Sequence, residues 1–391
     1  MPDFSFLSDF SFPLVYQLLI TAVLCALTAT GAWNIWRMKR LGGSSPLPIG
    51  SSSPFPIDGR HISVLVPARN EERCIEACVR SLCLQTYLNA EVIVLDDGST
   101  DATPSILRGL QLEFPTLKVI CGTPLPTGWV GKSWACHQLS LVATGDVLLF
   151  TDADTVHEKE CLAATAEFVR DEDVEFFSVV PFEIMGSFAE HVVIPMIHVL
   201  FMCSVPTGLG KNKGRNPAAA ANGQFMCFTR AGYEKAGGHV GVHDSMVEDL
   251  FLAKNAKRAG LRMIMIDATH LVSCRMYENA RDVIDGFSKN FFPATNYNLL
   301  STAFFMMHVV TAYIVPVFFW LEGWYALTVI QLSAAACIRL MIALKFRMPL
   351  WHVFLQPITA TYAVFIGMNS IRWSYSKQGL RWKGRSYSKG E

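Results

Sequence analysis

The feature that most constrains this chain is a long stretch without charge near its start. Residues 14–36 contain no charged side chain, and as a helix they would extend roughly 34 Å, enough to cross a bilayer. No Lys or Arg precedes the stretch, whereas Arg37, Lys39 and Arg40 follow it directly. By the positive-inside rule, the N-terminus lies outside and the chain after Arg40 lies in the cytoplasm. A cleaved signal peptide, the competing interpretation, would begin with positive charge and have a shorter apolar region.

Three further apolar runs, residues 302–321, 323–344 and 350–370, lie near the C-terminus. The first two predict a membrane hairpin. The third leaves two alternatives open: it spans the membrane and places the basic tail outside, or Pro357 breaks it into a re-entrant or interfacial piece. Only 17% of the residues are charged, against roughly 25% in typical globular domains, as expected for a chain that enters lipid. We therefore expect a multi-pass protein of the inner cell membrane.

Composition also limits the classes of partner. The formal net charge is +0, so the chain lacks the basic excess typical of proteins that bind nucleic acid, and no such partner is expected. The 11 cysteines include no CxxC pair, which predicts reduced thiols in a cytosolic environment. A shorter apolar run, residues 192–209, is interrupted by Pro195 and Pro206 and is expected to lie in the membrane interface.

A stretch rich in Gly, Ser and Pro follows the first apolar segment and predicts a flexible tether. The expected organisation is a membrane anchor (1–40), a linker (41–60), a soluble domain (61–292), a C-terminal transmembrane region (293–371) and a basic tail (372–391).

Apolar runs alternate with helical patterns in the first half of the soluble domain. Strands are expected at 62–66, 92–95, 117–121 and 147–150, and helices at 72–84, 102–113 and 132–143. The strands are nearly continuous Val, Ile and Leu, which is typical of a parallel sheet covered on both faces. Repeated strand–helix units of this kind predict a doubly wound α/β domain.

Polar clusters follow three of these strands, at Pro67–Glu71, Asp96–Asp101 and Asp152–Asp154. In such sheets ligands bind beyond the carboxyl ends of the strands, so the clusters should face one site, although Asp101 alone is as well explained as a helix cap. Asp152 and Asp154 repel each other and cannot be cheaply buried unpaired, so a cation should lie beside them. Oxygen ligands favour Mg²⁺ or Mn²⁺, which would neutralise a diphosphate leaving group.

A phosphate-binding P-loop is a rival interpretation of Gly128–Ser133. The pattern needs Gly where Pro126 stands, and the preceding loop is too long for a tight turn. An ATPase is therefore disfavoured, although Gly131 and Lys132 at a helix start could still hold phosphate.

Six motifs together resemble glycosyltransferase family 2, whose members are inverting enzymes with the GT-A fold. They are VPARNEE (66–72), DDGSTD (96–101), GKSWA (131–135), DAD (152–154), NGQFM (222–226) and VEDLFL (247–252). The resemblance runs from about Ile62 to Phe292. It implies a nucleotide-sugar donor and a divalent cofactor, Mg²⁺ or Mn²⁺.

The resemblance also implies roles for individual residues. The residues that would bind the donor are Arg69, Glu71, Asp97, Lys132 and Gly223. Asp152 and Asp154 would bind the metal, and the pair Glu248 and Asp249 would be catalytic. Asp249 is the expected general base. Successive helical residues point about 100° apart, so only one carboxylate of the pair can face the acceptor. The alternative is that both merely favour a helix N-terminus.

The chain is similar, among subfamilies, to membrane-bound transferases that glycosylate carotenoids or hopanoids, a likeness that includes residues 275–292. The expected acceptor is a carotenoid hydroxyl; hopanoid, polyprenyl phosphate and diacylglycerol are alternatives, and a non-catalytic scaffold is a different class. Processive synthases carry Gln-x-x-Arg-Trp before their C-terminal spans, whereas the match here, Gln378–Trp382, lies in the tail. Polymer synthesis is therefore disfavoured, and the tail is expected to be a basic membrane-interface anchor.

Three other features have a functional and a simpler interpretation. Lys211–Arg215 could contact anionic headgroups, but a solvated loop is the simpler expectation. His239 or His243 could complete a metal site, but loop histidines are the simpler expectation. The helical run 276–291 could guide a lipid towards Asp249 or could merely pack against the catalytic domain.

Overall fold

The computed structural model describes residues 12–43, 59–203, 220–376 and 379–387. The chain forms two compact units, each made of segments that are distant in the sequence. The helical unit comprises residues 1–37, 186–208 and 278–374, and the α/β unit comprises residues 38–185, 209–277 and 375–391. The C-terminal tail thus belongs to the α/β unit, although the apolar helices separate it from that unit in the sequence.

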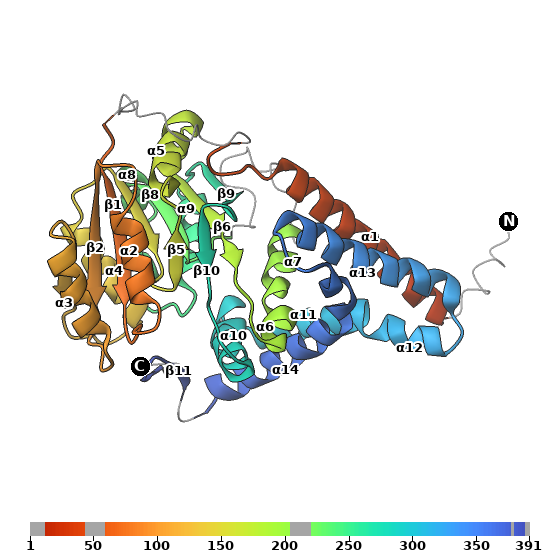
Figure 1. The fold of residues 1–391 in the computed structure, drawn as a ribbon. Coiled ribbons are helices and arrows are strands. Elements are labelled where there is room, and N and C mark those ends of the chain that lie inside the picture. Colours follow the sequence, from red (N-terminus) through yellow and green to blue (C-terminus); the bar gives the residue numbers. More distant parts are fainter. Residues whose placement is uncertain (1–11, 44–58, 204–219, 377–378, 388–391) are drawn as a thin grey trace. The chain divides into compact units, whose positions relative to one another are not determined.

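The α/β unit is built on a seven-stranded sheet of order β3-β2-β1-β4-β8-β6-β9 (Figure 1). The strands, in that order, are Lys118–Cys121, Ala90–Asp96, Ile62–Ala68, Val147–Thr151, Phe225–Thr229, Phe176–Val180 and Met263–Asp267. Strand β8 pairs antiparallel with both neighbours, and every other pairing in this sheet is parallel. The four predicted strands are confirmed as β1, β2, β3 and β4, and the sheet is mixed rather than purely parallel.

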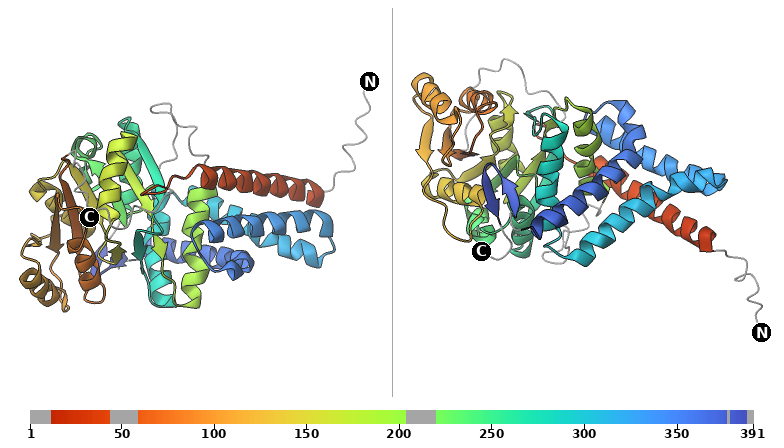
Figure 2. Two further views of the ribbon diagram at one scale, coloured as in Figure 1. Left: turned by 45° about the horizontal axis from the view of Figure 1, so that its top comes forward. Right: turned by 90° about the horizontal axis from the view of Figure 1, so that it is seen from below.

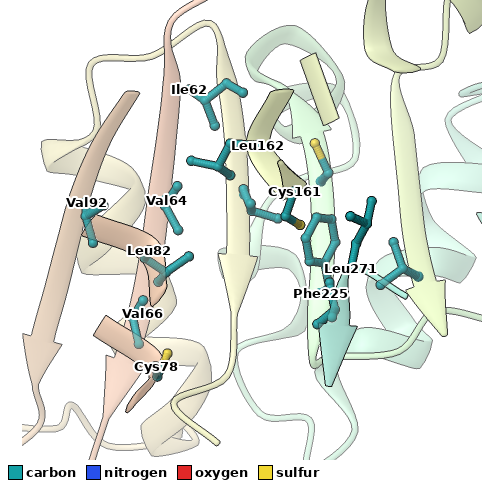
Figure 3. Packing of buried hydrophobic residues seen from close by; sticks show 14 of the residues in the cluster. Ile62, Val64, Val66, Cys78, Leu82, Val92, Cys161, Leu162, Phe225 and Leu271 are labelled. Atoms are coloured by element: carbon teal, nitrogen blue, oxygen red, sulfur yellow. The ribbon is translucent and has the colours of Figure 1, made fainter. Parts of the chain in front are cut away.

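Side chains of a strand alternate between the two faces of its sheet. Both sets are apolar in these strands, so helices cover both faces. Val64 and Val66 of β1 pack in one apolar cluster with α2 (Ile75–Cys83), α3 (Thr103–Glu113) and α5 (Cys161–Glu172). Figure 3 shows side chains of this cluster between the sheet and its helices. Leu65 faces the opposite cluster, with α4 (Gly131–Val142) and α9 (Glu248–Arg258).

Smaller elements complete the α/β unit. A three-stranded sheet is formed by β5 (Thr155–His157), β10 (Val272–Cys274) and β7 (Phe182–Glu183), and the tail forms a hairpin of β11 (Leu380–Trp382) and β12 (Arg385–Tyr387). Helix α8 (Arg230–Lys235) and the short helix η2 (His239–Val242) precede α9.

The predicted linker begins later than expected. Leu41 is fully buried in the core of the α/β unit, and its backbone N–H donates to Asp267 at 2.9 Å. Residues 40–43 are therefore part of this unit, because a buried leucine with a paired backbone is not a tether. The remainder of the predicted linker, residues 44–58, lies outside the described residues.

The described residues of the helical unit include four helical segments that are long and apolar enough to cross a membrane: Pro13–Arg37, Leu299–Leu321, Tyr325–Lys345 and Leu350–Ser374. They correspond to the four apolar runs of the sequence. Its elements are α1 (Phe12–Arg37), α6 (Phe188–Val193), α7 (Pro195–Cys203), α10 (Ala280–Ala294), α11 (Leu299–Tyr313), α12 (Val315–Leu321), α13 (Tyr325–Lys345), η3 (Leu350–Leu355) and α14 (Gln356–Ser374).

Helices α1 and α13 lie side by side in both orientations of Figure 2, and the Gln331 side chain donates to the backbone oxygen of Gln17 at 3.1 Å. Pro357 does not interrupt α14, because it is the second residue of that helix, where its missing N–H would have no helical partner anyway. Residues 192–203 of the apolar run 192–209 lie in the α6–α7 segment of this unit, and residues 204–209 lie outside the described residues.

Candidate active site

The loops that follow β1 and β2 hold each other in place. Asn70 adopts a left-handed conformation with φ of 53°, which asparagine tolerates better than most residues. Its side-chain oxygen accepts from the backbone N–H of Thr100 at 2.8 Å, and its own N–H donates to the Ser99 hydroxyl at 2.9 Å. These bonds fix the backbone beside Arg69 and Glu71.

Arg69, Glu71 and Asp97 come together at the carboxyl ends of β1 and β2. The Arg69 guanidinium donates to the backbone oxygens of Asp97 and Gly98, the latter at 3.1 Å. The Asp97 residue is only 5% exposed, so its charge requires a partner. The three residues predicted to bind the nucleoside are therefore neighbours.

Asp152 and Asp154 follow β4, whose five residues are all buried. The Asp154 carboxylate has one buried oxygen without a hydrogen-bond partner among the described residues. Burial, followed by the nearby charges of Asp152 and Glu71, raises the pKa of Asp154 to about 7. A buried carboxylate with a free oxygen and acidic neighbours is suited to receive a cation.

Lys132 joins the acidic residues from the first turn of α4. Its ammonium lies 2.7 Å from Asp152 Oδ1 and 2.9 Å from Glu248 Oε1. Burial alone would lower the pKa of Lys132, but the two carboxylates outweigh it and hold this pKa well above its usual value. Burial would likewise raise the pKa of Glu248, yet Lys132 lowers it. Lys132 thus links the end of β4 to the start of α9.

Asp249 lies next to Glu248 but has different partners. Its Oδ2 accepts from the backbone N–H of Gly223 at 3.1 Å, and its Oδ1 from that of Leu250 at 2.7 Å. Burial, followed by the charge of Glu248, raises the pKa of Asp249 to about 6. The two carboxylates of the pair therefore point to different groups, and Asp249 is the one poised to exchange a proton near neutral pH.

Gly223 lies where a larger residue would crowd the site. A Cβ atom at this position would lie 3.1 Å from Lys132 Nζ and 3.4 Å from Asp249 Oδ2. The glycine thus permits the close approach of the backbone to the Lys132 ammonium and the Asp249 carboxylate. This places five of the predicted residues together: Gly223, Lys132, Asp152, Glu248 and Asp249.

The residues present fit a hard divalent metal only in part. Among the described residues, no group of three or more His, Cys, Asp or Glu side chains is arranged to hold a metal ion. Asp152 and Asp154 would therefore supply two carboxylates at most, and the remaining ligands would be water and substrate oxygens. That ligand set is typical of Mg²⁺ and of Mn²⁺ bound with a diphosphate.

Neither histidine considered as a metal ligand joins these carboxylates through a hydrogen bond. His239 is fully buried, and its Nδ1 lies 2.8 Å from the Tyr233 hydroxyl. His243 is exposed, with its Nδ1 3.0 Å from the backbone oxygen of Val240. His239 is the first residue of the short helix η2 and is not a loop histidine, whereas His243 follows that helix and is exposed, as expected for a loop histidine.

The tail hairpin contributes residues that the sequence analysis assigned elsewhere. Arg385 forms an ion pair with Asp97, and Lys383 Nζ lies 2.7 Å from Glu71 Oε1. The interface-anchor interpretation is therefore wrong for these two side chains, because both are engaged with carboxylates of the α/β unit. The motif Gln-x-x-Arg-Trp drew attention to the tail, but nothing in the sequence indicated these ion-pair partners. Lys211–Arg215 and Gln378 lie outside the described residues.

Buried acids outside the predicted set also lie in this region. Glu183 on β7 is 5% exposed, and burial raises its pKa to about 8, with a further contribution from Asp154. Its position follows from the small second sheet, which has no counterpart among the predicted strands.

Comparisons with known proteins agree with this arrangement. The sequence model of a family described as Glycosyl transferase family 2 matches residues 63–236. The chain is 30% identical over 236 residues to a 4,4'-diaponeurosporenoate glycosyltransferase of Staphylococcus haemolyticus, covering 59% of this chain and 60% of the relative. It is 40% identical over 108 residues to a beta-monoglucosyldiacylglycerol synthase of Nostoc, covering 27% of this chain and 21% of that protein. The chain thus spans three fifths or less of the length of these relatives.

A solved structure shows the same fold. The mannosyltransferase of Pyrobaculum calidifontis, in complex with GDP-Man and Mn²⁺, superimposes with a TM-score of 0.51 at 20% identity, covering 91% of this chain and 100% of that one. The mixed seven-stranded sheet with helices on both faces is therefore of the GT-A type, as predicted. Over residues 63–236 this chain therefore matches the sequence model of glycosyl transferase family 2.

Proposed function

We propose that this protein is a membrane-anchored, inverting glycosyltransferase that moves a sugar from a nucleotide sugar to a hydroxyl of a membrane lipid. The observation that supports this most is the position of Asp249. It is a carboxylate of raised pKa beside Gly223, near the Lys132 pair with Asp152, at the sheet edge where donors bind. The four apolar helical segments support a membrane-resident acceptor.

The reaction is a single displacement at the anomeric carbon. The acceptor oxygen forms a bond to that carbon as the bond to the diphosphate breaks, and the electron pair of the broken bond leaves with the diphosphate. The acceptor proton passes to Asp249, because an unassisted hydroxyl is a poor nucleophile near neutral pH. Glu248 stays paired with Lys132 and holds that ammonium towards the site.

The reaction also requires that the negative charge of the leaving diphosphate be stabilised. Mg²⁺ or Mn²⁺ held by Asp152 and Asp154 would neutralise the departing diphosphate. Lys132, placed by the first turn of α4, adds positive charge at the same carboxylates. Arg69, Glu71 and Asp97 line the neighbouring loops and would bind the nucleoside.

A carotenoid is the acceptor class that we favour, since a relative that aligns over more than half of this chain acts, by its name, on the carotenoid carboxylate 4,4'-diaponeurosporenoate. A carboxylate is already ionised near neutral pH, so the proton transfer to Asp249 applies to a carotenoid that bears a hydroxyl. Diacylglycerol is a second candidate, since the beta-monoglucosyldiacylglycerol synthase of Nostoc reaches a higher identity over a shorter segment. The family domain is common to both, so the acceptor has to be identified by experiment.

The test uses the full chain in detergent micelles with nucleotide sugars and either carotenoid or diacylglycerol. We expect transfer to one lipid class, with the Asp249→Asn variant losing at least roughly a hundredfold in turnover. Asparagine retains the shape of the side chain and one acceptor oxygen but cannot take the proton. Donor binding, measured separately by calorimetry, should remain close to that of the unchanged protein.

Two results would contradict the proposal. One is the absence of transfer from any nucleotide sugar to any lipid hydroxyl tested. The other is a fall of less than about tenfold in Asp249→Asn together with lower stability, which would make Asp249 a structural residue at the start of α9. Asp244→Asn, an exposed change just before α9, serves as the matched control.

A further inference from the structure

The tail hairpin contacts three segments that carry predicted donor-binding residues: the loops after β1 and β2 and the first turn of α4. Arg385 forms two hydrogen bonds with the Asp97 carboxylate, one of them 2.9 Å from Nη2 to Oδ1. The Lys383 ammonium lies 2.7 Å from Glu71 Oε1, and the Lys383 backbone oxygen accepts from Arg69 Nε at 3.0 Å. The hydroxyl of Tyr387 accepts from the backbone N–H of Gly131, the first residue of α4, at 3.1 Å.

The geometry of the hairpin explains how so short a segment reaches these groups. Lys383 and Gly384 both have positive φ, of 46° and 79°, and they connect β11 to β12 in a two-residue turn. Arg385 and Tyr387 are two residues apart on β12, so their side chains share one face of the strand. Leu380 of β11 is buried, with 2% of its surface exposed.

The candidate site has an excess of negative charge that the hairpin reduces. The candidate site has the carboxylates Glu71, Asp97, Asp152, Asp154, Glu248 and Asp249, and the cations Lys132 and Arg69. A divalent metal would offset two of the excess negative charges, but the diphosphate of a donor would bring about two more. Arg385 and Lys383 supply two positive charges at the carboxylates nearest the predicted nucleoside site.

We propose that the C-terminal hairpin, residues 380–387, is part of the donor site, and that Arg385 and Lys383 bind the nucleoside diphosphate of the donor. This inference rests on the proposed function. Without Arg385, the buried Asp97 carboxylate loses its counter-charge and repels the incoming diphosphate. The guanidinium also offers donors beyond those used on Asp97, and these match phosphate oxygens.

A self-inhibiting role for the hairpin predicts the opposite change in nucleotide affinity. If the hairpin merely occupies the site and must leave before the nucleotide enters, its removal would tighten nucleotide binding, since a binding-competent state that is only partly populated weakens apparent affinity. The direction of the change in affinity therefore separates a donor-binding hairpin from a self-inhibiting one.

The experiment measures binding of UDP, GDP, CDP, ADP and dTDP to the full chain in detergent by calorimetry with Mn²⁺. For the nucleotide that binds, Arg385→Gln should raise Kd at least about tenfold. Arg385→Lys retains the charge but not the bidentate geometry, so its Kd should lie between that of the unchanged protein and that of Arg385→Gln. The donor KM should rise in parallel, while kcat at saturating donor changes little. Arg262→Gln, an exposed change before β9 at the opposite edge of the sheet, should leave Kd unchanged.

An unchanged Kd in Arg385→Gln, or a lower one, overturns the inference. Lys383→Gln provides a second variant, because Lys383 and Glu71 are partly exposed and their pair can be removed with less risk to folding. It should raise Kd by a smaller factor, and an unchanged or lower value counts against the inference in the same way. If the unchanged protein binds none of the nucleotides, the proposed function itself fails; if it binds one and both variants match it, the hairpin inference alone fails.

Discussion

Carboxylates of the same chemical kind have different partners in this site. Asp97 is paired with Arg385 and Glu248 with Lys132, whereas Asp154 retains a buried oxygen without a hydrogen-bond partner among the described residues. A buried ionised carboxylate without a counter-charge destabilises the fold. Asp154 is therefore the position at which added metal should have the largest effect.

Asp154→Asn should abolish metal-dependent transfer while the protein remains folded, because asparagine fills the same space without the charge. Mn²⁺ should raise the Tm of the unchanged protein and leave that of Asp154→Asn unaffected, since a ligand stabilises only the state that binds it. Asp171→Asn, on the exposed side of α5, is the control and should respond to Mn²⁺ like the unchanged protein. Full activity of Asp154→Asn, or activity of the unchanged protein in excess chelator, would refute the metal assignment.

The raised pKa of Asp249 predicts how turnover depends on pH. Its pKa is raised to about 6 by burial and then by Glu248, and a general base must be deprotonated to act. Turnover should therefore fall as pH decreases through about 6 and approach a plateau above it, as measured by kcat between pH 5 and pH 8. Because the folded pKa lies above that of a free aspartate, ionisation of Asp249 costs stability, so Asp249→Asn should be at least as stable at pH 7. A rate that is constant down to pH 5 would exclude Asp249 as the base.

At the scale of elements, continuous apolar runs made β1, β2, β3 and β4 predictable. A strand buried on both faces must consist of Val, Ile, Leu or Phe, and the polar residues that end it must lie at the edge of the sheet. That argument placed Arg69, Asp97 and Asp152 at one edge before their side-chain partners were known. The strand β8 could not be oriented in this way, because an apolar run does not encode whether its neighbour is parallel.

The tail hairpin was beyond sequence reasoning for a different reason. Its strands have only three residues each, and its register depends on two residues with positive φ, Lys383 and Gly384, of which only the glycine is a local signal. Its partners, Asp97 and Glu71, lie about 300 residues earlier in the chain. Such distant ion pairs leave no periodic trace, so the basic residues were assigned to a membrane interface instead. Leu41 was assigned to the linker for a similar reason, because Gly and Ser surround it.

For the whole molecule, the hairpin bears on the open question of the last apolar helix. We propose that the α/β unit lies in the cytoplasm, because Arg37, Lys39 and Arg40 follow the first apolar helix and α13 ends at Lys345, followed by Arg347. The hairpin belongs to the α/β unit, so residues 375–387 must lie on the same side of the membrane as Asp97. On this proposal both ends of the segment 350–374 would lie on the cytoplasmic side, although its length and composition would allow it to span.

This topology can be tested with a membrane-impermeant maleimide on intact cells. Cys121 is exposed on the α/β unit and should react only after permeabilisation, which marks the cytoplasmic side. In a Cys121→Ser background, Glu322→Cys, in the turn between α12 and α13, should be labelled from outside, because α11 and α12 cross the membrane once. Ser376→Cys, just after α14, should behave like Cys121 and stay unlabelled until the membrane is opened, with the Cys121→Ser parent as the control for the remaining thiols. External labelling of Ser376→Cys, when Cys121 of the unchanged protein reacts only after permeabilisation, would mean that the segment crosses the membrane and that the hairpin is separated from Asp97. It would refute both the cytoplasmic tail and the donor-site role of Arg385.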